Sequence, residues 1–229
     1  MWAICAWLIG GVPSGAAEPS VGSAKPAPAL AAASTGSTAP ASSDLLDRIQ
    51  AKYATVSVLR GTFVQKSGSA LYGEDEQSGT VVLERPGKMR WEFADGRRYV
   101  SDGSTMWIYT PADKQVIRIK GFDAQAATAD AVLQSLHQLK TLFDVTIVST
   151  DPKAGHELSL LPKTADDAQF KKLVLKLDAA LLIDVVQIVD LFDTVTTIDF
   201  RSVELGGAVA PDVFTFQVPD GVQVIDAGS

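Results

Sequence analysis

The sequence is poor in the residues that build metal and thiol sites. It has one cysteine, Cys5, and two histidines, His137 and His156, among 229 residues. A single cysteine cannot form a disulfide within the chain, and two histidines without a second thiol leave few ligands for zinc. These shortages exclude a disulfide scaffold and argue against metal and thiol chemistry. We expect no cofactor.

Positive charge is also in short supply. The chain has 20 Lys and Arg residues against 27 Asp and Glu residues, a formal net charge of −7, and no basic cluster. Affinity for DNA or RNA depends on Lys and Arg neutralising phosphates, so nucleic acid is excluded as a partner. A hydrophobic share of 46% and a charged share of 21% are typical of a globular protein.

The motifs of common enzymes are missing. No serine lies in a Gly-x-Ser-x-Gly elbow, and no glycine-rich phosphate loop opens a helix. His156-Glu157 is not followed by a second histidine four residues on, so it is not a zinc-protease helix. His137 is best interpreted as a surface or partly buried side chain. We therefore predict that the protein is not an enzyme.

The first residues have the outline of an export signal. Residues 1–17 begin with an apolar run and end in the small residues Gly15-Ala16-Ala17, as secretory signals do, although no basic residue precedes the run. The apolar run has 11 residues, which is short of the roughly 20 that span a bilayer. We predict a signal peptide over 1–17, cleavage before Glu18 and a periplasmic protein.

A linker and a single domain follow. In residues 18–43, 22 of 26 positions are Ala, Ser, Pro, Thr or Gly, a composition that cannot form a core. We predict a disordered linker there. The remaining residues, 44–229, are enough for one domain.

Two helices are expected in this domain. Ser43 can cap a helix that begins at Asp44, and apolar residues then recur at helical spacing. They are Leu45, Leu46, Ile49, Tyr53 and Val56. The same spacing predicts a second helix over 123–141.

Strands are expected in the rest of the domain, because apolar and polar residues alternate there. In the most regular example, Met89, Trp91 and Phe93 share one face. Similar faces occur near Leu158 and near Leu173. The other predicted strands are 58–66, 79–85, 98–102, 105–110, 115–120, 142–149, 183–190 and 194–200. About eleven short strands favour an antiparallel barrel or a strongly curled sheet.

Arg85 breaks its local pattern. Alternation places it on the same strand face as Val81 and Leu83, which are expected to point inward. A guanidinium at the rim of an apolar interior needs acceptors, unless it turns to solvent at the strand end. Pro86-Gly87 then turns the chain into the strand of Trp91, so the arginine and that strand are neighbours in a hairpin.

Four blocks in this order resemble the periplasmic outer-membrane lipoprotein carriers, the LolA family. They are Gly61-Thr-Phe63-x-Gln65, the run from Gly79 through Arg85-Pro86-Gly87 to Arg90-Trp91-Glu-Phe93, the run from Val100-Ser101-Asp102-Gly103 through Trp107-x-Tyr109 to Gln115-Val116, and Phe214-x-Phe216-x-x-Pro219-x-Gly221-Val222. The resemblance covers 44–229. Its departures are a long linker before Asp44, a methionine at Met89, and an end so soon after Ile225 that we expect no additional C-terminal strand.

The resemblance implies an incomplete, unclosed antiparallel barrel under a lid of helices, and a carrier that moves acylated lipoproteins from an inner-membrane ABC transporter to an outer-membrane acceptor. It implies that Arg85 latches the lid through helix carbonyls, expected within 123–141. It also makes seven apolar residues candidates for an acyl-chain cavity, although such residues are core in most proteins. They are Phe63, Leu83, Met89, Trp91, Phe93, Leu136 and Leu139. We expect a monomer.

Other functions fit the same features. A lid-covered barrel could act as an envelope sensor or a protein-binding module, and a carrier could move a glycolipid instead of a lipoprotein. An esterase on a barrel is a third, catalytic alternative. Acylated cargo that co-purifies with the protein would separate a carrier from a sensor.

Overall fold

The computed structural model describes residues 39–69, 73–122, 136–164 and 170–227. One long helix, α2 (Ala39–Ala54), precedes a series of strands. The strands are β1 (Val58–Ser69), β2 (Gly73–Glu84), β3 (Lys88–Phe93), β4 (Arg98–Asp102), β5 (Thr105–Thr110), β6 (Gln115–Lys120), β7 (Phe143–Asp151), β8 (Gly155–Pro162), β9 (Phe170–Leu177), β10 (Ile183–Asp190), β11 (Val195–Leu205) and β12 (Gln223–Asp226). The short helices are η2 (Leu136–Gln138), α4 (Leu139–Leu142) and η3 (Pro211–Phe214).

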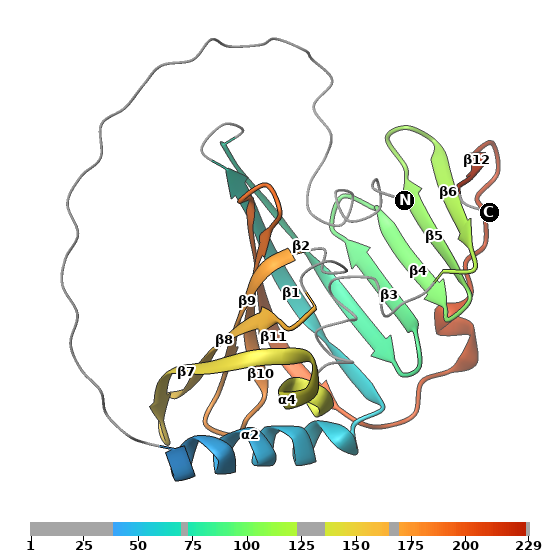
Figure 1. Ribbon diagram of the computed structural model, residues 1–229. Helices are drawn as coiled ribbons and strands as arrows, with labels where there is room; N and C mark the ends of the chain where they lie inside the picture. Colours follow the sequence, from blue (N-terminus) through green and yellow to red (C-terminus); the bar gives the residue numbers. More distant parts are fainter. Residues whose placement is uncertain (1–38, 70–72, 123–135, 165–169, 228–229) are drawn as a thin grey trace, which may run out of the picture.

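All described strands belong to one sheet, in the order β12-β6-β5-β4-β3-β2-β1-β11-β10-β9-β8-β7. Strands β1 to β6 and strands β7 to β11 each form a meander, in which every strand pairs antiparallel with the next. The pairing of β1 with β11 joins the two meanders. The ends of the order, β12 and β7, do not pair with each other, so the sheet is not closed into a barrel (Figure 1). The predicted fold class, mainly β and unclosed, is confirmed.

Alternation gives the sheet an apolar inner face. In β3, Met89, Trp91 and Phe93 are buried and the residues between them are half-buried. The same inward parity continues in the neighbouring strands, for example at Phe63 in β1 and Ile108 in β5. One contiguous cluster of buried residues contains side chains from both meanders. The inner face of the curled sheet is therefore the core of the molecule.

Helix α2 covers this inner face at one end of the sheet (Figure 1). Leu45, Leu46, Ile49 and Tyr53 of the predicted apolar stripe are buried in the cluster. The helix begins at Ala39, so Ser43 lies inside it and the predicted cap at Ser43 is wrong. A helix can start this early because proline is tolerated in the first turn, where Pro40 lies.

The predicted second helix lies partly outside the described residues. Of 123–141, the structure describes 136–141, which form η2 and most of α4. Leu136 and Leu139 are fully buried there. Both short helices contact α2, so α2, η2 and α4 together form the helical cover.

The C-terminal segment covers the opposite, outer face of β3 to β6. We call residues 206–227 the C-terminal strap. It crosses β3 and β4 at η3 and ends in β12, which pairs parallel with β6. The expectation of no additional C-terminal strand is wrong, because four residues are enough to pair along the free side of β6. The predicted signal peptide and most of the predicted linker lie outside the described residues.

Candidate functional site

The seven predicted cavity residues lie in one buried cluster, five of them on the inner face of the sheet and two, Leu136 and Leu139, in the helical cover. Each is at most 6% exposed, and all belong to the same buried cluster as α2. Phe63 packs edge-on against Trp91, with ring centroids 4.8 Å apart, and against Phe93 at 5.3 Å. Side chains of α2, η2 and α4 belong to the same cluster and pack with those of the sheet.

Gly79 explains how two aromatic rings fit side by side on this face. It pairs with Phe63 on one side and with Phe93 on the other. A Cβ at this position would lie 2.0 Å from the carbonyl oxygen of Glu92 and 2.9 Å from the Phe63 ring. Any larger residue would push β2 away from β3, so this glycine is required for the close approach of the strands.

Trp91 carries a buried polar atom on this apolar face. The residue is 2% exposed, and its ring also faces Phe200, with centroids 6.3 Å apart. Its indole Nε1–H is buried and meets no acceptor among the residues that the structure describes. Most buried donors in proteins are paired, so this group is an exception to explain.

Arg85 lies just beyond the end of β2 and is half-buried. Its Nη2 donates to the carbonyl oxygen of Tyr53 at 2.7 Å and to that of Val56. Its Nη1 lies 3.2 Å from Nδ1 of His137 in η2. A guanidinium can only donate, so the imidazole accepts at Nδ1. The arginine thus contacts the C-terminal end of α2 and also η2.

The prediction that Arg85 bonds helix carbonyls within 123–141 stays a prediction, because most of that range lies outside the described residues. The acceptors that the structure shows belong to α2 and to the residues just after it, whereas 123–135 lie outside the described residues. These last carbonyls of a helix have no partner within the helix and carry its negative dipole end. They are suitable acceptors for a cation. A pocket beside the guanidinium is lined by Tyr53, Leu59 and Leu83.

Tyr53 attaches α2 to the turn between β9 and β10 through its side-chain hydroxyl. Its hydroxyl donates to the carbonyl oxygen of Leu181 at 3.1 Å and accepts from the Ile183 N–H at 2.9 Å. Burial raises the pKa of Tyr53, so the phenol stays protonated. Lys52 adds a bond from Nζ to the carbonyl oxygen of Ala180 at 2.7 Å. The turn between β9 and β10 is therefore a second attachment point of α2.

Polar contacts also join α2 to α4. The Lys140 N–H donates to Oε1 of Gln50 at 3.0 Å, and the Lys140 ammonium pairs with Asp47. These contacts, like those of Arg85, are formed by side chains on the edge of the cover. The cover therefore has an apolar underside and a polar rim.

No arrangement for metal binding is present in the described ranges between 39 and 227. No three His, Cys, Asp or Glu side chains there lie close enough to hold an ion. His156 is buried, with its Nδ1 2.7 Å from the Thr150 hydroxyl. No helix of the described part is long and apolar enough to cross a membrane.

The amino-acid sequence of this chain is similar to those of known proteins. A family model described as "Outer membrane lipoprotein carrier protein LolA" matches residues 54–217. The chain belongs to the LolA family. An outer-membrane lipoprotein carrier protein of Cupriavidus necator is 31% identical over 195 residues, which are 82% of this chain and 90% of the relative. One of Alkalilimnicola ehrlichii is 28% identical over 183 residues, 77% of this chain and 81% of the relative.

A solved structure shares the fold of this LolA-family chain. An uncharacterized conserved protein from Thermus thermophilus superposes with a TM-score of 0.50 at 12% identity, covering 82% of this chain and 99% of the other. At that identity the likeness concerns the fold alone. The resemblance inferred from the four sequence blocks is confirmed by the family model and the relatives.

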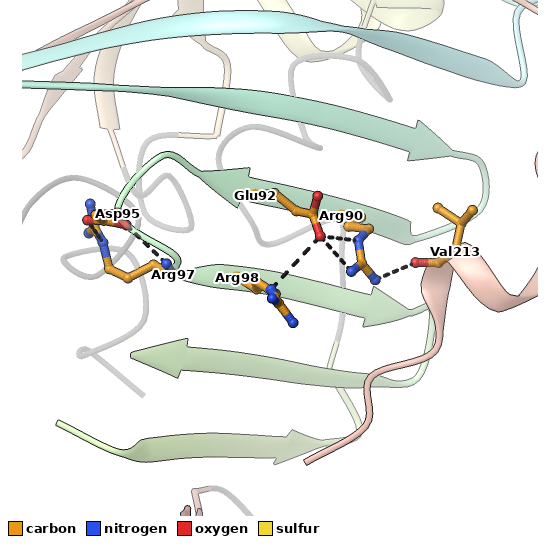
Figure 2. Close-up of polar contacts among 6 residues, drawn as sticks. All are labelled: Arg90, Glu92, Asp95, Arg97, Arg98 and Val213. Atoms are coloured by element: carbon orange, nitrogen blue, oxygen red, sulfur yellow. Dashed lines mark hydrogen bonds and ion pairs between the residues drawn. The ribbon is translucent and has the colours of Figure 1, made fainter. Parts of the chain in front are cut away.

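The four LolA-like blocks come together in space around β3. The first block lies in β1, the second covers β2 and β3, and the third extends from β4 to β6. The fourth block lies in the C-terminal strap, where Phe216 stacks on Trp107 at a centroid distance of 6.3 Å. Figure 2 shows the outer face of β3, where Arg90 contacts Glu92 and donates to the carbonyl oxygen of Val213 at 2.9 Å.

Sequence reasoning missed the dual role of Tyr53. Its place in a helical apolar stripe predicted a core residue, which it is. Its carbonyl and hydroxyl are also attachment points of α2, to Arg85 and to the β9–β10 turn. A tyrosine among aliphatic residues was the available signal, since a buried hydroxyl needs a partner.

Proposed function

We propose that this protein is a periplasmic carrier that binds the acyl chains of lipoproteins against the inner face of its sheet. It receives them from an inner-membrane ABC transporter and delivers them to an acceptor at the outer membrane. Membership of the LolA family supports the carrier role, and the curated relatives bear that name. The proposal involves binding and release, with no covalent step.

The proposal rests on one observation. Helices cover the apolar inner face of the sheet, and polar side chains hold the edge of these helices in place. Leu45, Ile49 and Leu139 of the cover pack on the face, while Arg85 and Tyr53 fasten its edge. Apolar packing of this kind can be exchanged for acyl chains without loss of buried area. The polar bonds at the edge then set how readily the exchange takes place.

The energies are suited to such an exchange. Burying one methylene group is worth about 0.8 kcal/mol, so one chain of about 15 carbons represents on the order of 10 kcal/mol. A carrier must match much of this free energy and still release the chain to the next acceptor. Closing the cover returns apolar contacts and the Arg85 bonds to the empty protein. Closure thereby helps to expel the cargo.

In this proposal Arg85 is the latch of the cover. Its guanidinium bonds to α2 and η2 are available only while both elements lie over the sheet. The charged donor contributes about 1.5 to 3 kcal/mol per bond. The seven predicted residues, five from the sheet and two from the cover, then line the cavity of the open state, where Phe63, Trp91 and Phe93 contact acyl chains.

The test is native mass spectrometry of the protein purified from cells that make lipoproteins. We expect the wild-type protein to carry acylated species. A Phe93→Glu variant should lose them, because an unpaired buried charge is strongly disfavoured. Thr62→Glu, at an exposed position of strand β1, is the matched control. Circular dichroism verifies the fold of both variants.

Two outcomes would contradict the proposal. One is wild-type protein that carries no acylated species, and the other is a folded Phe93→Glu variant that retains them. A bound polypeptide without acyl groups would favour the sensor alternative. N-terminal sequencing of the exported protein tests its location, and a chain that retains Met1 in the cytoplasm would contradict a periplasmic role.

A further inference from the structure

The buried indole N–H of Trp91 is a hydrogen-bond donor without an acceptor among the described residues. Trp91 is 2% exposed and lies in the middle of the inner face, between its strand neighbours Val81 in β2 and Tyr99 in β4. The aromatic rings in contact with it are those of Phe63 and Phe200. Val81 and the two phenylalanine rings offer no conventional acceptor, and the Tyr99 hydroxyl does not accept from this N–H.

Such a donor weakens the empty protein. Leaving a buried donor unpaired costs about 1 to 3 kcal/mol, and phenylalanine would fill much of the same space without that penalty. The inner face already uses phenylalanine at Phe63, Phe93 and Phe200. The N–H is therefore a local disadvantage in the closed state, which a ligand in the open state could remove.

We propose that the Nε1–H of Trp91 binds the carbonyl oxygen that joins an acyl chain to its cargo, as an ester or an amide. The inference rests on the proposed carrier function and adds a specificity-determining residue to it. An apolar cavity recognises hydrocarbon but cannot tell an acyl chain from an alkyl chain of equal length. A single buried donor makes that distinction, because it stays unpaired when the ligand lacks the acceptor.

The surroundings favour a neutral acceptor over a charged one. The strand and ring neighbours of Trp91 named above carry no charge, and Arg85 is engaged at the rim of the cover. Burying a phosphate or carboxylate beside Trp91 would require a counter-charge. A carbonyl oxygen needs only one donor, and in an acylated lipid it directly adjoins the chain that the apolar face would bury.

The experiment compares two fluorescent probes of equal chain length. One is a palmitoyl ester and the other is the corresponding hexadecyl ether, which lacks the carbonyl. The wild-type protein should bind the ester about tenfold more tightly, the factor expected for one buried hydrogen bond. Trp91→Phe should weaken ester binding by about this factor and leave ether binding unchanged. Trp107→Phe, on the outer face beside Phe216, is the matched control and should keep the preference.

A second measurement does not depend on the variant. In the wild-type protein with 15N-labelled tryptophan, the indole proton of Trp91 should shift downfield when the ester probe binds and not when the ether probe binds. If Trp91→Phe does not fold, benzothienylalanine at position 91 keeps the shape of the side chain and removes the N–H.

The outcomes separate this inference from the carrier function. Equal affinity of the wild-type protein for both probes, or an ester preference that survives loss of the N–H, would overturn the inference and leave the carrier function standing. If neither probe binds, both the inference and the carrier function are overturned.

Discussion

Two segments cover the two faces of the sheet, and different kinds of interaction attach them to it. On the inner face, α2 joins the rest of the molecule through apolar packing and side-chain bonds, notably those of Arg85 and Tyr53. On the outer face, the C-terminal strap adds a backbone ladder between β12 and β6 and a two-bond ion pair between Arg118 and Asp226, at 2.6 and 2.8 Å. The strap is attached along its length, whereas α2 is attached at a few points.

The difference matches two mechanical roles. A backbone ladder must be broken bond by bond, so a segment held in this way remains in place. A helix satisfies its own backbone and can leave a surface without exposing unpaired groups along its length. In the proposed carrier the inner cover is therefore the part that opens, and the strap supports the wall behind Trp91. The variants that follow test this contrast.

The largest effect is expected from Phe214→Ala in the strap. Phe214 is 3% exposed, and the Lys88 ammonium lies 5.6 Å from its ring centroid. Removing such a side chain from a packed site typically costs about 3 to 5 kcal/mol. We expect that loss in the free energy of unfolding, measured by urea denaturation. A loss below about 1 kcal/mol would show that the strap is not a fixed part of the wall.

Arg85→Leu should act on opening instead of on global stability. Loss of a charged donor worth about 1.5 to 3 kcal/mol per bond should raise the open population by about one to two decades. The variant should accept labelled acylated cargo, hold it more tightly and release it slowly to liposomes. Arg85→Lys should restore release in part, because an ammonium lacks the planar fork that reaches two elements. Release at the wild-type rate by Arg85→Leu would contradict the latch.

Tyr53→Phe should have a smaller effect on the same cover. It removes the hydroxyl that bonds Leu181 and Ile183 while Arg85 keeps the Tyr53 carbonyl. We expect a loss of about 1 to 2 kcal/mol in the free energy of unfolding, because two buried backbone groups lose their partner. Hydrogen exchange should be faster at the Ile183 amide. An unchanged Ile183 amide would show that the β9–β10 turn does not hold α2.

The smallest effect is expected for the ion pair at the end of the strap. The Arg118 guanidinium bonds Asp226 and holds the pKa of that carboxyl below its usual range. The contribution of the pair is therefore present at neutral pH and is lost as the pH falls below the usual Asp value of about 3.9. Backbone NMR order parameters of β12 should fall under those conditions, and Asp226→Asn should lower them at pH 7. Global unfolding should be unchanged in that variant, since the pair is exposed.

Local patterns predicted most of the sheet, because its strands have one buried face. Met89, Trp91 and Phe93 alternate with polar residues, and β3 was predicted from them. The start of β2 had no such signal. Glu74, Asp75 and Glu76 form a strand because β1 pairs with them, and Lys66 lies 3.1 Å from Glu76. That strand segment depends on its partner, which a local pattern cannot reveal.

For the candidate site, a local pattern predicted which way the side chains of one strand point, but not what they contact. Parity placed Val81, Leu83 and Arg85 on one side of β2, and the structure buries the first two. The partners of Arg85 that the structure describes could not be derived, since they include Tyr53 on α2, about 30 residues earlier, and His137 on η2, about 50 residues later. Parity indicates a direction from one strand. Which carbonyls lie in that direction depends on how distant elements pack.

The seam between β1 and β11 has a consequence for the order in which the chain can assemble. Residues 58–120 form their meander from neighbours in sequence, whereas β1 also needs β11, with Thr62 opposite Arg201. Contacts between neighbours form quickly, and a contact across so many residues forms late because a long loop must first close. If the chain crosses a membrane from its N-terminus, β1 is present long before its partner. We expect the seam to be the last pairing to form, so that the apolar inner face acquires its full extent only when the chain is nearly complete.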